Sequence, residues 1–553
     1  MIERMIAWLV LSIVSAGAQD TGAPKGAAPG SIRGTVTAVG SDSPMAGVAV
    51  IVNGGTPGRV QTVTDPQGHF VVRGLEAGRY RVSAVAPGPN GRMGFGPEAT
   101  RQLELLAGQD LEGFDFHLVL LGQISGRVLD QNKEPVPGLT VFLVVREYVA
   151  GALRAVFTDS ADTDDQGEYH LTRVRAGRSY MVLAQRGWRN LPAISDAPAE
   201  PRLRRPAVVP TFYPNSRSMD GAEALVLRSG EQREGADIRL VRSPSFCIEA
   251  LVDGASPGDL TWGILEAQPA SGTSGSGGFY YSIPGGKPGA DGKIRVCDLH
   301  PGDYDLTVYE YARGTFGQAP RFGSMLVTVA DKDVQNVRLT ARPRIPLAGE
   351  VVWDGQPPAT PPEEKLSVML QAVSRTERGS FESTVPGTFS VEGGLLMDEF
   401  GVRVNRVPSG TYVKDITYGG HSILNLSLRL GSTMGDAGLR VVLARDGGTA
   451  STRVSDKDGN PVPDCSIVLI PGSAGNEAIL AASLTTGKTG LRGTWTSAPL
   501  APGKYYVLAT NDPIDQSPET IAKLWRARTA AQEIEVTPNG AATAILSEKA
   551  LDQ

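Results

Sequence analysis

The chain has 553 residues, more than one hydrophobic core accommodates, so several domains are expected. Its 67 glycines and 39 prolines show no three-residue period, which excludes collagen, and a hydrophobic content of 41% excludes a wholly disordered chain. A net charge of −6 over this length gives no electrostatic case for a nucleic-acid-binding protein.

Residues 1–18 have the features of a secretory signal peptide. Arg4 supplies a positive charge, residues 6–14 form a short apolar run, and small residues precede a cleavage site before Gln19. The run is too short to span a bilayer comfortably, and an uncleaved anchor is the alternative. We therefore expect an exported mature protein, periplasmic or extracellular, with no transmembrane segment after signal cleavage and a flexible leader over residues 19–30.

One phrase recurs along the chain. Residues 64–86 read TDPQGHFVVRGLEAGRYRVSAVA, and residues 163–184 read TDDQGEYHLTRVRAGRSYMVLA. Such recurrence indicates repeated structural units rather than one continuous fold. The fixed elements are two glycines ten residues apart with a tyrosine soon after the second: Gly68, Gly78 and Tyr80; Gly167, Gly177 and Tyr180; Gly292, Gly302 and Tyr304; Gly493, Gly503 and Tyr505.

Each copy is expected to form a hairpin-like unit. The Asp-containing text before the first glycine is typical of a turn, because aspartate caps its own backbone and glycine adopts positive φ. An alternating strand follows, then a second turn, then a returning strand that begins near the tyrosine. An aromatic residue stands two positions after the first glycine in three copies (Phe70, Tyr169 and Trp495), and Ile294 stands there in the remaining copy.

Further phrases recur around these hairpins. An opening strand precedes the hairpin, as at 123–130, and a closing phrase follows it, as at 228–240. Within a module the order is therefore an opening strand, a returning strand, the hairpin and a closing strand. This order favours a small antiparallel sandwich of about seven strands. A stretched copy lies around 386–394 and 407–420. We predict an all-β chain of five tandem antiparallel β-sandwich modules, transthyretin-like or immunoglobulin-like: module 1, 31–121; module 2, 122–242; module 3, 243–343; module 4, 344–446; and module 5, 447–549.

The pattern GxVxDxxxxPVPGxxVxL followed by TDxxGxYxLxxVxAGxYxVxA resembles the carboxypeptidase regulatory-like domain, a β-sandwich of the transthyretin-like or carbohydrate-binding-like kind. The resemblance is strong in modules 1 and 2, fair in module 5 and weak in modules 3 and 4. Strings of such domains are typical of large bacterial exported proteins. The marked residues are turn glycines and core aromatics, so the resemblance implies a fold rather than an activity.

The name of the family does not imply a peptidase here. Zinc carboxypeptidases carry this domain beside a separate catalytic domain, whose zinc is held by a His-x-x-Glu pair and a distant His. No histidine has glutamate at the third following position; the five are His69, His117, His170, His300 and His421. We expect no enzyme activity, no cofactor and no metal site, with an unrecognised hydrolase as the remaining alternative.

Two acidic segments are interpreted as turns rather than calcium sites. Residues 162–167 begin like an EF-hand loop, but Arg173 stands where that loop needs a bidentate glutamate. Residues 455–464 combine three carboxylates with an Asp-Gly pair. We expect a turn between strands at each place.

The main candidate for a binding surface is the glycine-rich segment 271–289. It holds Phe279, Tyr280 and Tyr281, and planar aromatic side chains on a loop stack on sugar rings or anchor protein partners. An ordinary strand with flexible flanks is the alternative. A second aromatic segment, 204–227, is expected to have a structural role.

Three cysteines occur in the chain. Cys247 and Cys297 both lie in strand-like text of module 3, and an oxidising compartment permits a disulfide, so we predict that they pair. Two buried free thiols are the alternative. Cys465 is expected to remain unpaired.

Repeats, export signal and motifs together favour an exported, non-catalytic multi-module protein. The expected partner is a polysaccharide or an envelope protein, as for a carbohydrate-binding, adhesion or envelope-scaffold protein. The alternative is an accessory subunit that binds a protein partner of an outer-membrane receptor or secreted enzyme system. No nucleic-acid partner is expected.

Overall fold

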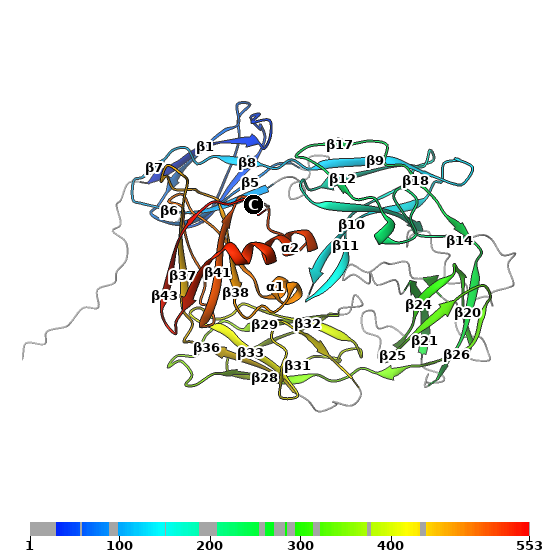
Figure 1. Ribbon diagram of the computed structural model, residues 1–553. Helices are drawn as coiled ribbons and strands as arrows, with labels where there is room; N and C mark the ends of the chain where they lie inside the picture. The colour runs from blue at the N-terminus through cyan, green and yellow to red at the C-terminus, as the bar shows by residue number, and fades with distance from the viewer. Residues whose placement is uncertain are drawn as a thin grey trace, which may run out of the picture.

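The computed structural model describes residues 29–55, 58–87, 98–149, 151–186, 207–253, 260–269, 283–284, 293–312, 321–372, 378–431 and 438–551. The expected signal peptide lies outside these ranges. The described chain folds into five successive β-sandwiches, so the predicted all-β fold of tandem modules is confirmed (Figure 1). No helix in the described ranges is both long and apolar enough to cross a membrane.

Module 1 shows the common plan. Its strands are β1 (Gly30–Ala38), β2 (Ala49–Gly54), β3 (Gly58–Val63), β4 (His69–Leu75), β5 (Gly78–Val85), β6 (Glu98–Leu105), β7 (Asp110–Leu111) and β8 (Phe116–Leu118). The opening strand β1 pairs with β4, β7 and β8 in one sheet, and the second sheet has the order β3-β2-β5-β6. Alternate residues of β5 (Tyr80, Val82 and Ala84) are buried between the sheets, as expected of a strand with one face on the core.

Module 2 repeats this plan with a longer hairpin. Its elements are β9 (Gly122–Leu129), β10 (Leu139–Val149), β11 (Ala152–Asp162), β12 (Glu168–Val174), β13 (Ser179–Arg186), β14 (Ala207–Val208), β15 (Thr211–Phe212), the 3-10 turn Met219–Gly221, β16 (Leu225–Val226), β17 (Gln232–Arg233), β18 (Ile238–Arg239) and β19 (Arg242–Ser243). Phe212 and Met219 pack with Leu183 in a small hydrophobic cluster. The described part of segment 204–227 therefore has the structural role expected of it.

Module 3 contains a disulfide. Its strands are β20 (Phe246–Asp253), β21 (Leu260–Pro269), β22 (Ile283–Pro284), β23 (Lys293–Leu299), β24 (Gly302–Ala312), β25 (Arg321–Val329), β26 (Val334–Thr340) and β27 (Arg342–Pro343). Cys247 on β20 is bonded to Cys297 on β23, which is the neighbouring strand of the same sheet. The bond therefore joins the opening strand to the strand that returns beside it.

Module 4 differs from the expected repeat. Its strands are β28 (Ala348–Trp353), β29 (Leu366–Ala372), β30 (Arg378–Ser383), β31 (Gly387–Ser390), β32 (Glu399–Asn405), β33 (Tyr412–Tyr418), β34 (His421–Ser422), β35 (Ser427–Arg429) and β36 (Leu439–Ala444). The expectation that 407–420 supplies the returning strand is wrong. Strand β32 pairs with β29 in that role, with Phe400 buried, whereas β33 pairs with β36 in the other sheet. The Gly-x-Tyr motif at Tyr412 is absent from β32, so the motif pointed to β33 instead of the strand that pairs with β29.

Module 5 contains two helices that the sequence analysis did not predict. Its elements are β37 (Thr449–Ser455), β38 (Ser466–Pro471), α1 (Glu477–Ser483), β39 (Thr485–Lys488), β40 (Thr494–Thr496), β41 (Gly503–Thr510), α2 (Pro518–Ala527), the 3-10 turn Arg528–Ala530, β42 (Gln532–Val536) and β43 (Ala541–Ser547). Ser517 caps α2 by accepting a hydrogen bond from the Thr520 N–H, and Pro518 occupies the first turn. Ile521 and Leu524 bury the apolar face of α2 in a cluster with Leu480 of α1.

Opening and closing strands pair in parallel in every module, whereas the other strand pairs of the antiparallel sandwiches run antiparallel. The pairs are β1 with β7 and β8, β9 with β17 and β18, β20 with β26, β28 with β36, and β37 with β43. Because the first and last strands run in the same direction, the chain enters a module at one end and leaves at the other. This geometry allows the modules to follow one another in series.

A carboxylate supports the parallel pairing in modules 1 to 3. In the closing segment of module 1, Asp115 Oδ1 accepts a hydrogen bond from the Thr35 N–H of β1 at 2.7 Å. Asp237 accepts in the same way from the opening strand of module 2, and Asp333 accepts from that of module 3. The acidic residue of the closing phrase therefore stabilises the junction between first and last strands.

A buried threonine makes the same two hydrogen bonds in modules 1, 2 and 5. Thr163 Oγ1 accepts from the Leu139 N–H at 2.9 Å and donates to the Val136 carbonyl at 2.9 Å. Thr64 and Thr489 make the corresponding bonds in their own modules. The threonine therefore satisfies backbone groups at the start of the second strand, which burial would otherwise leave without partners.

The repeated tyrosine closes the turn that precedes it. Tyr80, Tyr304 and Tyr505 each donate their hydroxyl to the carbonyl oxygen four residues earlier, at 2.7–2.8 Å. Tyr180 instead accepts a hydrogen bond from the Arg175 N–H at 3.1 Å. In all four modules the ring lies in the core and the hydroxyl binds turn backbone, so the tyrosine has a structural role.

The two acidic segments are turns, as predicted. Asp164 Oδ1 accepts hydrogen bonds from the Gln166 and Glu168 N–H groups at 2.9 and 2.8 Å. Asp456 Oδ1 accepts from the N–H groups two and four residues further on, at 2.9 and 2.8 Å. Each carboxylate is therefore engaged by the backbone of its own turn.

Replacing Gly167 with alanine is expected to lower the free energy of unfolding of module 2 by about 2–4 kcal/mol. Gly167 has a φ of +70°, and a Cβ would lie 2.8 Å from the Val128 oxygen and 3.0 Å from the Val136 nitrogen. Gly177 has a φ of +77° with nothing within 4 Å of a Cβ. Gly177→Ala is therefore the matched control, with a loss of about 1–2 kcal/mol from backbone conformation alone.

The measurement is urea unfolding of the intact chain, with hydrogen exchange of β9 and β12 used to assign the transition to module 2. Equal losses in the two variants would contradict a role for the close approach at Gly167.

Candidate functional site: the contacts of module 5 with its neighbours

The aromatic residues predicted to bind a ligand, Phe279, Tyr280 and Tyr281, lie outside the described residues. They fall in the connection between β21 and β23 of module 3, which includes β22, and β22 pairs with β21 at Glu266 and Ala267. Their binding role stays a prediction. In modules 2 and 5 the same part of the fold is formed by the hairpin of β10 and β11 and by the connection that contains α1, and both contact another module.

In module 2 the hairpin of β10 and β11 reaches module 5 (Figure 1). Tyr148, near the end of β10, packs against the hydrophobic cluster formed by Leu480 of α1 and Ile521 and Leu524 of α2. The Tyr148 N–H donates a hydrogen bond to the Gln516 carbonyl at 2.8 Å. The long hairpin of module 2 and the two helices of module 5 therefore share one apolar contact.

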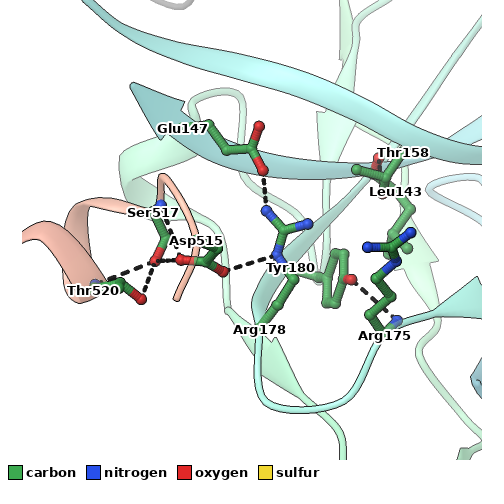
Figure 2. Close-up of polar contacts among 9 residues, drawn as sticks. All are labelled: Leu143, Glu147, Thr158, Arg175, Arg178, Tyr180, Asp515, Ser517 and Thr520. Carbon is green, nitrogen blue, oxygen red and sulfur yellow. Dashed lines mark hydrogen bonds and ion pairs between the residues drawn. The ribbon is translucent and has the colours of Figure 1, made fainter. Parts of the chain in front are cut away.

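Arg178 lies at the polar centre of this contact (Figure 2). Its guanidinium binds Glu147 of β10, and its Nε lies 3.1 Å from Asp515 Oδ2 in the segment before α2. The three side chains are 16–23% exposed. Asp515 also accepts hydrogen bonds from the Ser517 N–H at 3.0 Å and the Ser517 hydroxyl at 2.5 Å. One partly buried cation of module 2 therefore pairs with carboxylates from two modules.

The charges of this cluster stabilise one another. Burial alone would raise the pKa of Asp515, but hydrogen bonds from Ser517 and Thr520 and the charge of Arg178 outweigh it and lower that pKa. Burial alone would lower the pKa of Arg178, and the carboxylates of Glu147 and Asp515 outweigh it and raise that pKa. The ionised forms are therefore the stable ones at neutral pH.

A second contact joins module 5 to module 1. Arg101 of β6 is 11% exposed in its side chain, and its Nε lies 2.8 Å from Asp464 Oδ2. The same guanidinium donates to the Asp115 carbonyl at 2.7 Å and stacks 4.5 Å from the centre of the Phe114 ring. Leu491 of module 5 packs against the core of module 1. Arg101 is thus held by both modules at once.

A third contact lies at the junction of modules 4 and 5. Tyr412 Oη donates a hydrogen bond to Asp446 Oδ1 at 3.0 Å, and the Asp446 carbonyl accepts from the Asn539 N–H at 2.9 Å. Burial, together with the nearby Asp446 carboxylate, raises the pKa of the Tyr412 hydroxyl. Module 5 therefore contacts modules 1, 2 and 4, and Figure 1 shows it in orange and red beside them.

Cysteine chemistry does not contribute to these contacts. Cys465 is a free thiol that is fully buried in the core of module 5, as expected of an unpaired residue. Burial raises the pKa of its thiol to about 11, so the group stays protonated at neutral pH. Among the described residues, no three His, Cys, Asp or Glu side chains are grouped as a metal site would require.

The sequence analysis did not find Arg178, Asp515 or Arg101. One signal was available for Arg178. Tyr180 stands three positions after Gly177, whereas the repeated tyrosine stands two positions after the second glycine in modules 1, 3 and 5. The extra residue changes the turn that carries Arg178. Arg101 and Asp515 carry no such mark, because their roles depend on which module lies opposite.

Comparison with known proteins gives a family for module 1. Residues 31–119 match the family model of the carboxypeptidase regulatory-like domain, which confirms the resemblance inferred from the repeat. No curated protein matches the chain.

Several solved structures are similar at 9–12% identity. The Bacillus anthracis TIE protein is 10% identical, with coverage of 96% of this chain and 76% of that chain and a TM-score of 0.15. A Streptococcal ancillary pilin is 9% identical, with coverage of 55% and 99% and a TM-score of 0.19. BcpA, the major pilin subunit of Bacillus cereus, is 12% identical, with coverage of 55% and 98% and a TM-score of 0.15. TM-scores this low do not establish a common arrangement of modules.

Proposed function

Because residues 31–119 match the carboxypeptidase regulatory-like domain and partly buried contacts join module 5 to its neighbours, we propose that the protein is an exported, non-catalytic scaffold. The observation that carries this proposal is the set of contacts that module 5 makes with modules 1, 2 and 4. Partly buried ion pairs at Arg101 and Arg178 and the apolar contact at Tyr148 hold modules that are far apart in sequence in one arrangement. Such an arrangement keeps the loops at the module ends in constant relative positions.

The scaffold presents the aromatic connection of module 3 to a polysaccharide of the cell envelope. Phe279, Tyr280 and Tyr281 supply planar side chains, which stack on sugar rings. The hairpin of β10 and β11 in module 2 and α1 in module 5 support this assignment, because the same part of the fold contacts another module in both cases. The loops of a β-sandwich vary freely while the core is retained, so one fold accommodates both uses.

The test is a glycan array probed with residues 19–553 and with the Tyr280→Ala/Tyr281→Ala variant. We expect binding to a defined group of glycans that the variant loses. His421→Ala, which removes an exposed ring from module 4, is the control and is expected to bind as the parent does. Binding that survives in the aromatic variant would move the site away from module 3.

Absence of binding to any glycan on the array would favour the alternative, an accessory subunit that binds a protein of an outer-membrane receptor or secreted enzyme system. Pull-down from an envelope extract distinguishes the two, because the accessory role predicts one stoichiometric protein partner. The non-catalytic assignment would be contradicted if the protein hydrolysed members of a peptide or glycan panel and lost this activity on substitution of a single side chain.

A further inference from the structure

The strand that follows the tyrosine-bearing strand has an unusual surface in module 3. This sixth strand is β6 in module 1, β25 in module 3 and β42 in module 5, and each pairs with the tyrosine-bearing strand. We compare the residue of the sixth strand that pairs with the position directly after the repeated tyrosine. This residue is Gln102 in module 1 and Glu533 in module 5. Leu326 stands there in module 3, with 63% of its surface exposed.

Most of the outer edge of β25 has no partner strand in the described part of the chain. Strand β27 pairs with β25 at Arg321 and Phe322, and no described strand pairs with that edge from Met325 to Val329. Open edges are templates for pairing with another chain, and proteins protect them with charged residues. Strand β42 follows that rule with Glu533 and Glu535, whereas β25 presents Met325 and Leu326.

A hollow of about 220 Å³ adjoins this edge where modules 3 and 4 meet. Its apolar lining includes Met325 of β25 and Met397 of module 4, which are 37% and 44% exposed, and the buried Leu339 of β26. Its charged lining consists of Arg338 and Arg342. Arg338 lies 3.3 Å from Asp253, and no ion pair is recorded for Arg342 within the described part of the chain. The hollow therefore combines flexible apolar side chains with positive charge.

We propose that the edge of β25 binds an extended acidic peptide, which adds as a strand to the sheet of module 3. The open backbone edge recognises an extended main chain, the methionine-lined hollow takes an apolar side chain, and Arg342 pairs with a carboxylate. Leu396 and Met397 of module 4 also line the hollow, so a bound peptide would contact both modules.

The chain contains a precedent for this use of a sixth strand. Arg101 stands opposite Val82 in module 1, as Met325 stands opposite Leu306 in module 3. At that position Arg101 pairs with Asp464 of another module. The sixth strand is therefore already a docking element where the acidic partner belongs to the same chain.

The experiment uses two fluorescein-labelled octapeptides, one of alternating glutamate and valine and one of alternating lysine and valine, added to the intact protein. We expect the glutamate peptide to bind at least about tenfold more tightly by fluorescence anisotropy. Arg342→Glu is expected to abolish this preference, and Leu326→Glu is expected to weaken binding. Gln102→Glu, at the same position of module 1, is the matched control and leaves binding unchanged.

Hydrogen exchange locates the bound peptide. The glutamate peptide is expected to protect alternate amides between Met325 and Val329, and circular dichroism shows that each variant is folded. Equal affinity for the two peptides, failure of the glutamate peptide to bind, or protection confined to other strands would overturn the proposal. A dimer of the protein that Leu326→Glu dissociates would also overturn it, because the occupant would then be a second copy.

Discussion

Replacing Arg178 with leucine is expected to separate module 5 from module 2 and to lower the free energy of unfolding by about 3 kcal/mol. The loss comes less from the missing attraction than from the carboxylates of Glu147 and Asp515, which would stay partly buried without a cation. Small-angle scattering should show a more extended particle, because the contact joins modules that are far apart in sequence. Urea unfolding measures the change in stability.

Two controls accompany this prediction. Arg127 pairs with Glu168 within module 2, but the two side chains are 58% and 36% exposed, so Arg127→Leu is expected to cost less than about 1 kcal/mol. Adding Glu147→Gln and Asp515→Asn to the Arg178→Leu protein removes the two carboxylate charges that lack a cation. This triple variant should recover part of the stability that Arg178→Leu loses. A scattering profile unchanged by Arg178→Leu would show that the contact does not hold the modules together.

The same contact is expected to weaken in acid. The folded-state pKa of Asp515 lies below its ordinary value of 3.8. The unfolded chain therefore binds this proton first, and the stabilisation is complete above pH 3.8 and declines as the pH falls through the folded-state pKa. Asp515→Asn is expected to remove this part of the acid sensitivity of the contact.

Removing the disulfide of module 3 is expected to lower the stability of that module by up to about 4 kcal/mol. The bond between Cys247 and Cys297 closes a loop across 50 residues, and a crosslink of that length restricts the unfolded chain strongly. The variant is Cys247→Ser/Cys297→Ser, and hydrogen exchange of β20 and β23 measures the loss. The sheet of β20, β23 and β26 has three strands, so the crosslink supports a small structure.

A reductant supplies the control for this experiment. Dithiothreitol is expected to destabilise β20 and β23 in the parent protein and to leave the double-serine variant unchanged. Cys465 is a buried free thiol of module 5, so the exchange of β38 and β41 should not respond to the reductant. Equal exchange in parent and variant would mean that the loop contributes little to stability.

Much of each module was predictable because its signals are local. A turn such as Asp164–Gly167 depends on a carboxylate and the N–H groups that follow it within a few residues. The alternation of β5 reports its buried face directly, and the glycine spacing brings together two strands that are neighbours in sequence. These are short-range properties, and the tandem β-sandwich fold followed from them.

Other features of the fold were predicted wrongly from the sequence or were not predicted at all. In module 4 the Gly-x-Tyr motif at Tyr412 marks an inserted strand, and Phe400 occupies the core position without the motif. The two helices of module 5 lie in connections, where the repeat imposes no pattern. The aromatic segment at Tyr280 was chosen from composition alone and lies outside the described residues.

Repetition, turn chemistry and alternation were thus sufficient for the fold class, the series of modules and the pairing hypothesis for two cysteines. The tertiary structure alone placed Arg178 beside Asp515, Arg101 beside Asp464, and an apolar edge at Leu326 where sister modules carry polar residues. The physical reason is distance along the chain. Backbone turns and strand alternation are encoded within about ten residues, whereas contacts between modules join positions hundreds of residues apart, whose proximity is set only when the modules pack.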